Sequence, residues 1–190
     1  MKEKFLKQAE REYSPGKRLI ALLIEGVFFL GILPVALVYL SSLLDIRFDL
    51  PRFDYGAINV VTGWVFVVSG FLFACWAIYV QFTIGRGTPA PVMATQELII
   101  QKPYNYCRNP MALGTIVLYF GVAILLNSIS AVILVLGGAI LLLAYIKFLE
   151  EREMEMRFGE AYQEYRKQTP FVMPRLWQRK RTEKPQAGKR

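Results

Sequence analysis

Long blocks of apolar residues alternate with short polar stretches along the chain, and this pattern predicts the architecture. The apolar blocks run from Leu19 to Leu44, from Ile58 to Ile84, from Ala112 to Leu126 and from Ala131 to Leu149. A run of about 20 apolar residues is the length of a membrane-spanning helix, whereas a soluble domain interleaves apolar and polar residues at helix or strand periods. We therefore expect an all-α, polytopic helical membrane protein with four transmembrane helices.

Local signals refine these helices. Pro34 lies inside the first block and leaves the carbonyl of Leu30 without its usual donor, which predicts a kink near Leu30. The third block is short for a full span, and its helix is expected to begin at Pro110, a favourable first-turn residue. Residues 127–130 (NSIS) form a turn so short that the last two blocks must be an antiparallel hairpin.

The distribution of Lys and Arg predicts the orientation. With four crossings, residues 1–18, the stretch 85–114 and the tail from Lys147 onward share one side of the membrane, and they hold 21 of the 23 Lys and Arg residues. Cytoplasmic loops carry an excess of positive charge, so both termini are expected in the cytosol. We expect an inner or plasma membrane protein, and the charged start of the chain argues against a cleavable signal peptide.

The chain is expected to divide into three parts. Residues 1–84 hold an amphipathic cytosolic helix, ending at residues 14–16 (SPG), and the first two spans. Residues 85–175 form a core whose helix from 150 to 167 carries Glu153 and Arg157 in a favourable i,i+4 order and is broken or capped at Gly159. Residues 176–190 form a basic, disordered tail near anionic lipid, and its lack of interleaved aromatic residues argues against a nucleic-acid site.

The chain has no histidine and two cysteines, Cys75 and Cys107. This composition excludes Ser-His-Asp and Cys-His catalysis and metal sites built on histidine. We expect no bound metal, and both thiols are expected to be inert. Glu25, a carboxylate inside the first block, is equally consistent with a functional site and with a side chain that reaches the interface or pairs with a Lys.

The stretch from Gly85 to Gly114 is the longest segment between two apolar blocks, and loops of this length are usually either functional or disordered. The hairpin turn returns the chain to it, so Arg108 and Asn109 should lie close to Glu150. An arginine with helix N-terminal donors suits an anionic group, and a carboxylate suits an ammonium. This combination predicts a cytosolic site for a zwitterionic ligand.

The motifs in this half of the chain resemble a known family. They are GTPAP at 87–91, PY at 103–104, RNPMALG at 108–114, EE at 150–151 and FGEAYQEY at 158–165. In this order and spacing they are similar to the isoprenylcysteine carboxyl methyltransferase and phospholipid methyltransferase family of integral membrane enzymes. The resemblance covers about half of the chain, roughly residues 85 to 175, and residues 1–84 carry no signature of the family.

The resemblance implies S-adenosylmethionine as cofactor, held between the loop before the hairpin and the helix after it. It places the cofactor on Gln96, Glu97, Leu98, Ile99, Tyr104, Asn109, Pro110, Met111, Ala112 and Glu150. Arg108 and Glu151 are candidate catalytic residues, with Glu151 either a base or a supporting residue, and Lys147 is the candidate for substrate binding. The implied acceptor is lipophilic, either a lipid headgroup or an isoprenoid-linked carboxylate. Methyl transfer from a sulfonium mainly needs alignment of donor and acceptor, which suits a chain without histidine.

The sequence departs from the family pattern at four positions. Asn109 stands where the family has histidine, Ala112 where it has tyrosine, and Lys102 where it usually has glycine. The family's substrate-side arginine has Lys147 as its nearest counterpart. These changes weaken the prediction of the acceptor more than that of the cofactor.

Two other functions remain open from the sequence. A membrane reductase with a related hairpin core would bind a reduced nicotinamide cofactor and would need basic residues for its phosphate, for which Lys102 is thin support. A non-enzymatic membrane scaffold or carrier would tolerate replacement of Arg108 and Glu150. Arg108 is also consistent with an ordinary interfacial cation, and the two glutamates with a solvated helix start.

Overall fold

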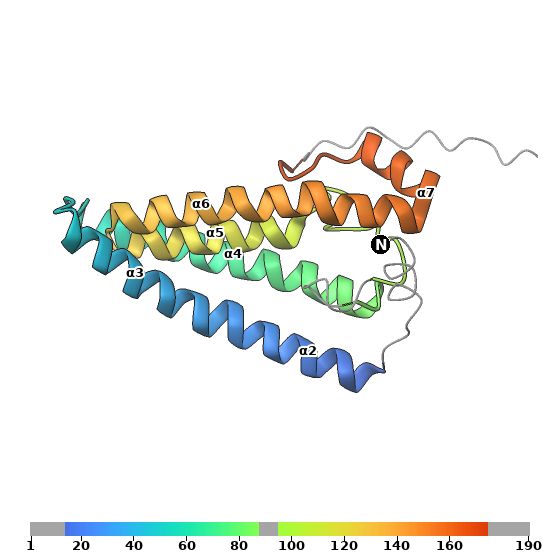
Figure 1. The fold of residues 1–190 in the computed structure, drawn as a ribbon, viewed down its shortest axis with the longest axis horizontal. Coiled ribbons are helices and arrows are strands. Elements are labelled where there is room, and N and C mark those ends of the chain that lie inside the picture. Colours follow the sequence, from blue (N-terminus) through green and yellow to red (C-terminus); the bar gives the residue numbers. More distant parts are fainter. Residues whose placement is uncertain (1–13, 88–94, 175–190) are drawn as a thin grey trace, which may run out of the picture.

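In the part that the structure, a computed structural model, describes, residues 14–87 and 95–174, helices are the only regular elements, and loops connect them (Figure 1). The α-helices are α2 (Pro15–Val27), α3 (Leu33–Arg47), α4 (Ala57–Thr83), α5 (Pro110–Leu125), α6 (Ile129–Tyr145) and α7 (Glu151–Gln168). These ranges contain no strand, so the all-α prediction is confirmed for them. Most of the predicted N-terminal helix, most of the GTPAP turn and the basic tail lie outside the described residues.

A π-helical turn, η1 (Phe28–Ile32), joins α2 to α3 within one long helix. The amide of Leu33 donates to the carbonyl of Phe28, five residues earlier, because the helix widens where Pro34 has no N–H to offer to Leu30. The irregularity therefore falls where the sequence predicted one. The helix itself begins at Pro15, about one turn before the expected first span.

Three helices are long and apolar enough to cross a membrane: Pro15–Arg47, Ala57–Thr83 and the continuous helix Ile129–Gln168. At 1.5 Å per residue, α4 is about 40 Å long and α5 about 24 Å, against a hydrocarbon core of about 30 Å. α5 has 16 residues and is shorter than a full span. Membrane helices are thus supported at three of the four predicted places.

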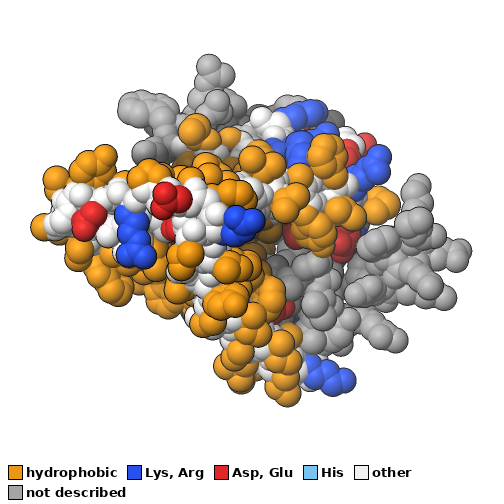
Figure 2. Space-filling view, turned by 60° about the vertical axis from the view of Figure 1, so that its left-hand side comes forward, with side chains coloured by type: hydrophobic (Ala, Val, Ile, Leu, Met, Phe, Trp, Pro, Cys, Tyr) orange, Lys and Arg blue, Asp and Glu red, His pale blue; other side chains and the backbone are white. Residues whose placement is uncertain are grey.

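Much of the surface is apolar, as lipid contact requires. Figure 2 shows hydrophobic side chains over a large part of one face, with charged groups gathered in few places. Leu23, Val35, Ile58 and Leu141 are 61–73% exposed although they belong to long apolar helices. Apolar patches of this extent mark membrane or protein contact surfaces.

Helices α4 and α5 touch through glycines. A β-carbon on Gly70 would lie 2.4 Å from the backbone nitrogen of Leu118, and one on Gly114 would lie 2.6 Å from that of Ala74. Small residues let membrane helices approach to backbone contact. This close contact fixes the start of α5 against the second half of α4.

The predicted hairpin of α5 and α6 is confirmed. Asn127 adopts a positive φ of 52°, and the Ser128 hydroxyl caps α6 by accepting from the amide of Ala131 at 3.0 Å. Asp45, at the end of α3, accepts from the amide of Ser130 at 3.2 Å. Figure 1 shows α5 and α6 side by side, so the end of α6 returns to the level at which α5 begins.

A second π-helical turn, η2 (Ile146–Glu150), leads from α6 into α7. Gly159 has φ 53° and ψ −127° and breaks α7, as the sequence predicted. The part of α7 after the break folds back across the end of the bundle, while α2 diverges from α4 and α5 at the same end (Figure 1). The folded-back part of α7 and the diverging helix α2 both border the candidate site.

Candidate functional site

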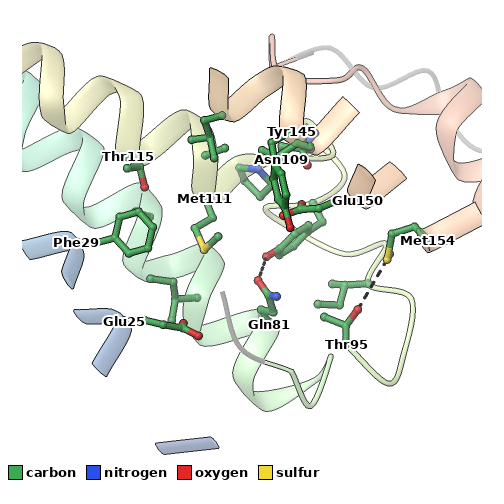
Figure 3. A pocket seen from close by; sticks show the side chains of 18 of the residues that line it. Glu25, Phe29, Gln81, Thr95, Asn109, Met111, Thr115, Tyr145, Glu150 and Met154 are labelled. Carbon is green, nitrogen blue, oxygen red and sulfur yellow. Dashed lines mark hydrogen bonds between the residues drawn. The ribbon is translucent and has the colours of Figure 1, made fainter. Parts of the chain in front are cut away.

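A cavity of about 400 Å³ opens among α2, η1, α4, α5, η2, α7 and the loop before α5 (Figure 3). Small-molecule sites usually have about 300–1,000 Å³. Its lining includes apolar side chains of the helices, such as Phe29, Phe71 and Tyr119, and polar side chains of the loop and of α7, such as Glu97 and Glu150. Apolar and polar groups therefore meet in one cavity.

Ten of the thirteen residues predicted from the sequence line this cavity. They are Glu97, Leu98, Ile99, Tyr104, Asn109, Pro110, Met111, Ala112, Glu150 and Glu151. Gln96, Arg108 and Lys147 do not line it. The structure thus brings together the loop, the start of α5 and the start of α7, three segments that are separate in the chain.

The loop folds back on the end of α4 through small residues. The amide of Gln96 donates to the carbonyl of Gly85 at 2.6 Å. A β-carbon on Gly87 would lie 2.8 Å from the backbone nitrogen of Thr95, so only a glycine fits this crossing. From the opposite side, the guanidinium of Arg157 donates to the carbonyl of Thr95. The segment 96–99 is thereby held at the edge of the cavity.

Tyr104 is fixed at both its ring and its backbone. Its hydroxyl donates to Oε1 of Gln81 on α4 at 2.9 Å (Figure 3), and its carbonyl accepts from the hydroxyl of Tyr165 at 2.6 Å. Burial, together with nearby Cys107 and Glu150, raises the pKa of the Tyr104 phenol well above its ordinary value. Tyr104 therefore stays protonated and acts as a donor.

Glu150 and Glu151 are consecutive but have different surroundings. The carboxylate of Glu151 is 6% exposed and accepts from Arg108 and from Nζ of Lys147, the latter at 2.7 Å. Glu150 forms no hydrogen bond or ion pair with the described residues, and Figure 3 shows it on the same side of the cavity as Asn109 and Met154. Of the two carboxylates, Glu150 is the one whose charge is not already compensated by an ion pair.

All three nitrogens of the Arg108 guanidinium form hydrogen bonds with other residues of the protein. Its Nε and Nη2 donate to the same oxygen of Glu151 at 2.9 and 2.5 Å, and its Nη1 donates to the carbonyls of Arg166 and Thr169 at 2.9 and 2.7 Å. These carbonyls belong to the end of α7, where backbone acceptors lack helical partners. The carboxylate next to Arg108 is therefore that of Glu151, and Arg108 ties the two ends of α7 to the start of α5.

The segment after α7 packs against the same place. The amide of Arg108 donates to the carbonyl of Pro170, and Nδ2 of Asn109 donates to the carbonyl of Phe171, both at 2.9 Å. The cations of Lys147 and Arg108 lie 5.2 and 5.7 Å from the centre of the Phe171 ring. Asn109 stands where the resembling family has histidine, and its hydrogen bond to Phe171 holds its side chain in place.

Several lining residues were not predicted, among them Gln81, Thr95, Met154 and Arg157. The sequence analysis treated Arg157 only as a helical partner of Glu153, yet its side chain is 8% exposed and joins the loop to α7. Met154 and Arg157 follow Glu150 by four and seven residues, the spacing of one helix face. That spacing was the signal that could have found them.

Cys107 is fully buried, whereas Cys75 is partly exposed and lines the cavity. Burial raises the pKa of the Cys107 thiol to about 11, opposed by a backbone hydrogen bond at Asn109. The Cys107 thiol is therefore protonated and unreactive at neutral pH. Across residues 14–87 and 95–174, no group of three or more Cys, Asp or Glu residues is placed to hold a metal ion.

Two comparisons with known proteins gave matches. The sequence model of the phospholipid methyltransferase family matches residues 58–161, which include α4, the loop, the hairpin and the start of α7. Methanethiol S-methyltransferase 2 of Bradyrhizobium diazoefficiens is 30% identical over 102 residues, which are 54% of this chain and 37% of that protein. The chain thus covers little more than a third of this relative. No solved structure matches the chain.

Proposed function

Because the chain belongs to the phospholipid methyltransferase family, we propose that it transfers the methyl group of S-adenosylmethionine to a lipophilic acceptor at the membrane surface. The observation that carries this proposal is the cavity, which ten of the thirteen residues suggested by the family resemblance line. The polar part of its lining suits a charged cofactor and the apolar part suits a hydrocarbon chain.

The polar residues of the lining fit the charges of this cofactor, which carries a sulfonium, an ammonium and a carboxylate. Glu150 offers a carboxylate that no described residue pairs with, and an ammonium or sulfonium supplies the missing positive charge. The first amides of α5, behind Asn109 and Pro110, are donors without helical partners and suit the cofactor carboxylate. Leu98 and Ile99 offer apolar surface to the adenine ring.

The cofactor supplies an activated methyl group on its sulfonium, so the protein's own residues mainly bind, orient and exclude water. Tyr104 keeps the loop in place through Gln81, and Arg157 keeps Thr95 against α7. Arg108 and Lys147 compensate the charge of Glu151. These ion pairs hold the start of α7 in place, and with it the neighbouring Glu150. Arg108 and Glu151 act in this proposal as positioning residues.

The membrane arrangement is part of the same proposal. α5 completes a fourth crossing together with the loop that precedes it, and both termini lie in the cytosol because most Lys and Arg residues are on that side. The polar part of the lining then faces the cytosol, where a water-soluble cofactor enters. The acceptor reaches the cavity from the membrane, past α2.

The acceptor is either a lipid headgroup or another long-chain molecule. The name of the relative from Bradyrhizobium favours a second candidate, a thiol, since that protein is a methanethiol S-methyltransferase. The family resemblance also implies a third candidate acceptor, an isoprenoid-linked carboxylate.

Methyl-labelled S-adenosylmethionine added to membranes that contain the protein tests the proposal. We expect labelled product in the organic extract, identified by mass spectrometry, with wild-type protein and much less with Glu150→Ala. Equal label in membranes without the protein would show that it does not transfer the methyl group.

A further inference from the structure

The long helix Pro15–Arg47 consists of an anchored half and a loosely packed half. In α3, Leu37 belongs to the core cluster that includes Ala131 and Val135 of α6. Five large apolar residues of α2 are instead 50–66% exposed: Leu19, Ile20, Leu23, Ile24 and Val27. A segment with few buried apolar contacts opens at a lower free-energy cost than a packed one. α2 is therefore the part of this helix that can move while α3 stays in place.

The π-helical turn η1, which separates the two halves, has the properties of a hinge. Leu33 donates to the carbonyl of Phe28, and Pro34 leaves the carbonyl of Leu30 without its usual donor. No residue of η1 is buried, and a β-carbon on Gly31 would meet nothing within 4 Å. Helices kink at prolines and at π-bulges, which are frequent at functional sites. The angle between α2 and α3 can therefore change at η1 without disturbing a packed core.

Arg18, in the first turn of α2, fastens this helix to the end of α4. Its Nη1 donates to the carbonyl of Phe82 at 3.0 Å, and its guanidinium carbon lies 4.6 Å from the centre of the Phe82 ring. Its Nε is buried and has no hydrogen-bond partner among the described residues. Because Arg18 lies at the end of a membrane span, water can replace the carbonyl as its partner at a modest cost. The contact is therefore reversible.

Between Arg18 and the hinge, α2 forms one wall of the cavity. Glu25 and Phe29 line it, and Figure 3 shows their side chains on the same side. Glu25 also has an interaction partner within the chain, and the hydroxyl of Tyr119 donates to the carbonyl of Phe29 at 2.5 Å. Leu30 and Phe71 line the cavity although they are 56% and 40% exposed. The cavity therefore reaches the outer surface of the bundle next to η1.

We propose that α2 is a gate to the cavity, which pivots at η1 and is held closed by Arg18 on Phe82. The gate rests on the proposed function, because it admits a long-chain acceptor from the membrane and then closes to exclude water from the transfer. At 1.5 Å per residue, about 18 Å of helix separate Leu30 from Arg18, so a pivot of about 15° moves the Arg18 end by about 5 Å.

The distance between α2 and α4 measures the gate directly and needs no activity. Nitroxide labels are attached to the full chain at Ile20→Cys and Tyr79→Cys, two positions that are 60% and 67% exposed. The background carries Cys75→Ser, because the other cysteine is buried. Pulsed electron paramagnetic resonance in lipid nanodiscs gives the distance distribution. Arg18→Gln is compared with Lys17→Gln, a matched control at an exposed neighbouring position.

We expect a minor population at longer distance in the wild type. Arg18→Gln should raise the ratio of the longer to the shorter distance about tenfold, as expected for the loss of a hydrogen bond to a charged group. Phe82→Leu should raise it about threefold, because only the ring contact is lost. Lys17→Gln should match the wild type. If Arg18→Gln does not fold, Phe82→Leu remains as the test. The wild-type distribution in every folded latch variant would overturn the gate.

Pro34→Ala tests the hinge. Alanine supplies the N–H that the carbonyl of Leu30 lacks, which favours a regular helix over the π-turn. Added to Arg18→Gln, it should therefore return the distance ratio toward the wild-type value. A longer-distance population that is as large with Pro34→Ala as without it would contradict the pivot at η1.

Methyl transfer from labelled S-adenosylmethionine tests whether α2 is an entrance. At limiting acceptor, Arg18→Gln should raise the rate with dodecanethiol several-fold relative to methanethiol, because only the long chain enters from the membrane past α2. An unchanged ratio of the two rates would overturn this role. Failure of the proposed function gives a different result: wild-type protein that neither binds nor uses S-adenosylmethionine would refute methyl transfer, while the label distances would still report on α2. Methyl transfer with the same distances in all latch variants would refute the gate alone.

Discussion

The guanidinium of Arg108 and the carboxylate of Glu151 form a buried ion pair that joins the start of α5 to the start of α7. Their side chains are 7% and 6% exposed, and two nitrogens of Arg108 contact one oxygen of Glu151. Removing one partner of a buried pair usually costs about 3–5 kcal/mol, and loss of Arg108 would leave Glu151 with the half-exposed Lys147 as its remaining cation. The pair is thus a structural connection between the halves of the site.

Replacing Arg108 should therefore destabilise the protein before it alters the chemistry. We expect Arg108→Gln to lower the free energy of unfolding by at most about 3–5 kcal/mol, because Lys147 still compensates part of the charge of Glu151; the measurement is denaturation in detergent. Arg108→Lys should be intermediate, because lysine keeps the charge but not the planar fork of donors. The control is Lys167→Gln, whose side chain is 75% exposed and should change stability by less than about 0.5 kcal/mol. Wild-type stability of Arg108→Gln would contradict this account.

Arg157 should control the affinity for the cofactor through the loop. It holds the carbonyl of Thr95 next to the segment 96–99. We expect Arg157→Gln to weaken binding of S-adenosylmethionine about tenfold, the effect of losing one charge-assisted hydrogen bond. Arg152→Gln, at an exposed position one turn earlier, is the control. Unchanged affinity in a folded Arg157→Gln variant would show that the loop does not depend on this contact.

The contact between α4 and α5 should not tolerate a methyl group. A β-carbon on Gly70 would lie 2.4 Å from the Leu118 nitrogen and 2.6 Å from the Gly114 carbonyl. We expect Gly70→Ala to cost about 1–3 kcal/mol of stability through overpacking. Gly137→Ala on α6 meets nothing within 4 Å and should stabilise its helix by about 0.5–1 kcal/mol. Equal effects of the two substitutions on thermal unfolding would refute this packing.

The two cysteines should differ in accessibility. Cys75 lines the cavity, whereas Cys107 has no exposed surface. We expect N-ethylmaleimide to modify Cys75 and not Cys107 in the native protein, as determined by peptide mass spectrometry, and a bound long-chain ligand to slow the modification. Labelling of Cys107 before denaturation would contradict its burial and show that the chain just before α5 is accessible in the native protein.

The helices were predictable because apolar blocks, Pro34, Pro110 and Asn127 are local signals. Length and hydropathy mark the spans, and each turn or break needs only its own residues. The loop residues were proposed as a site because their order and spacing resemble a family, and their role stays a prediction. For the helices, the sequence prediction and the structure agree at three of the four expected spans.

The partners within the site were less predictable. The sequence placed Arg108 beside Glu150, but η2 rotates the chain so that Glu151 faces Arg108. It treated Arg157 as half of a surface pair, because only the folded loop brings Thr95 to it. Glu25 remained undecided, since no local pattern shows that α2 closes the far wall of the cavity. Each of these depends on contacts between segments that are distant in sequence.

The measurement that tests the central claim most directly is the binding of S-adenosylmethionine to purified protein by calorimetry. We predict saturable binding to the wild type, competition by the demethylated product, and affinity lowered about tenfold or more in Glu150→Gln, which removes the charge but keeps the shape. Glu160→Gln should bind like the wild type. Absence of binding to folded wild-type protein would contradict the account of the cavity, and undiminished binding by Glu150→Gln would contradict the role given to that carboxylate.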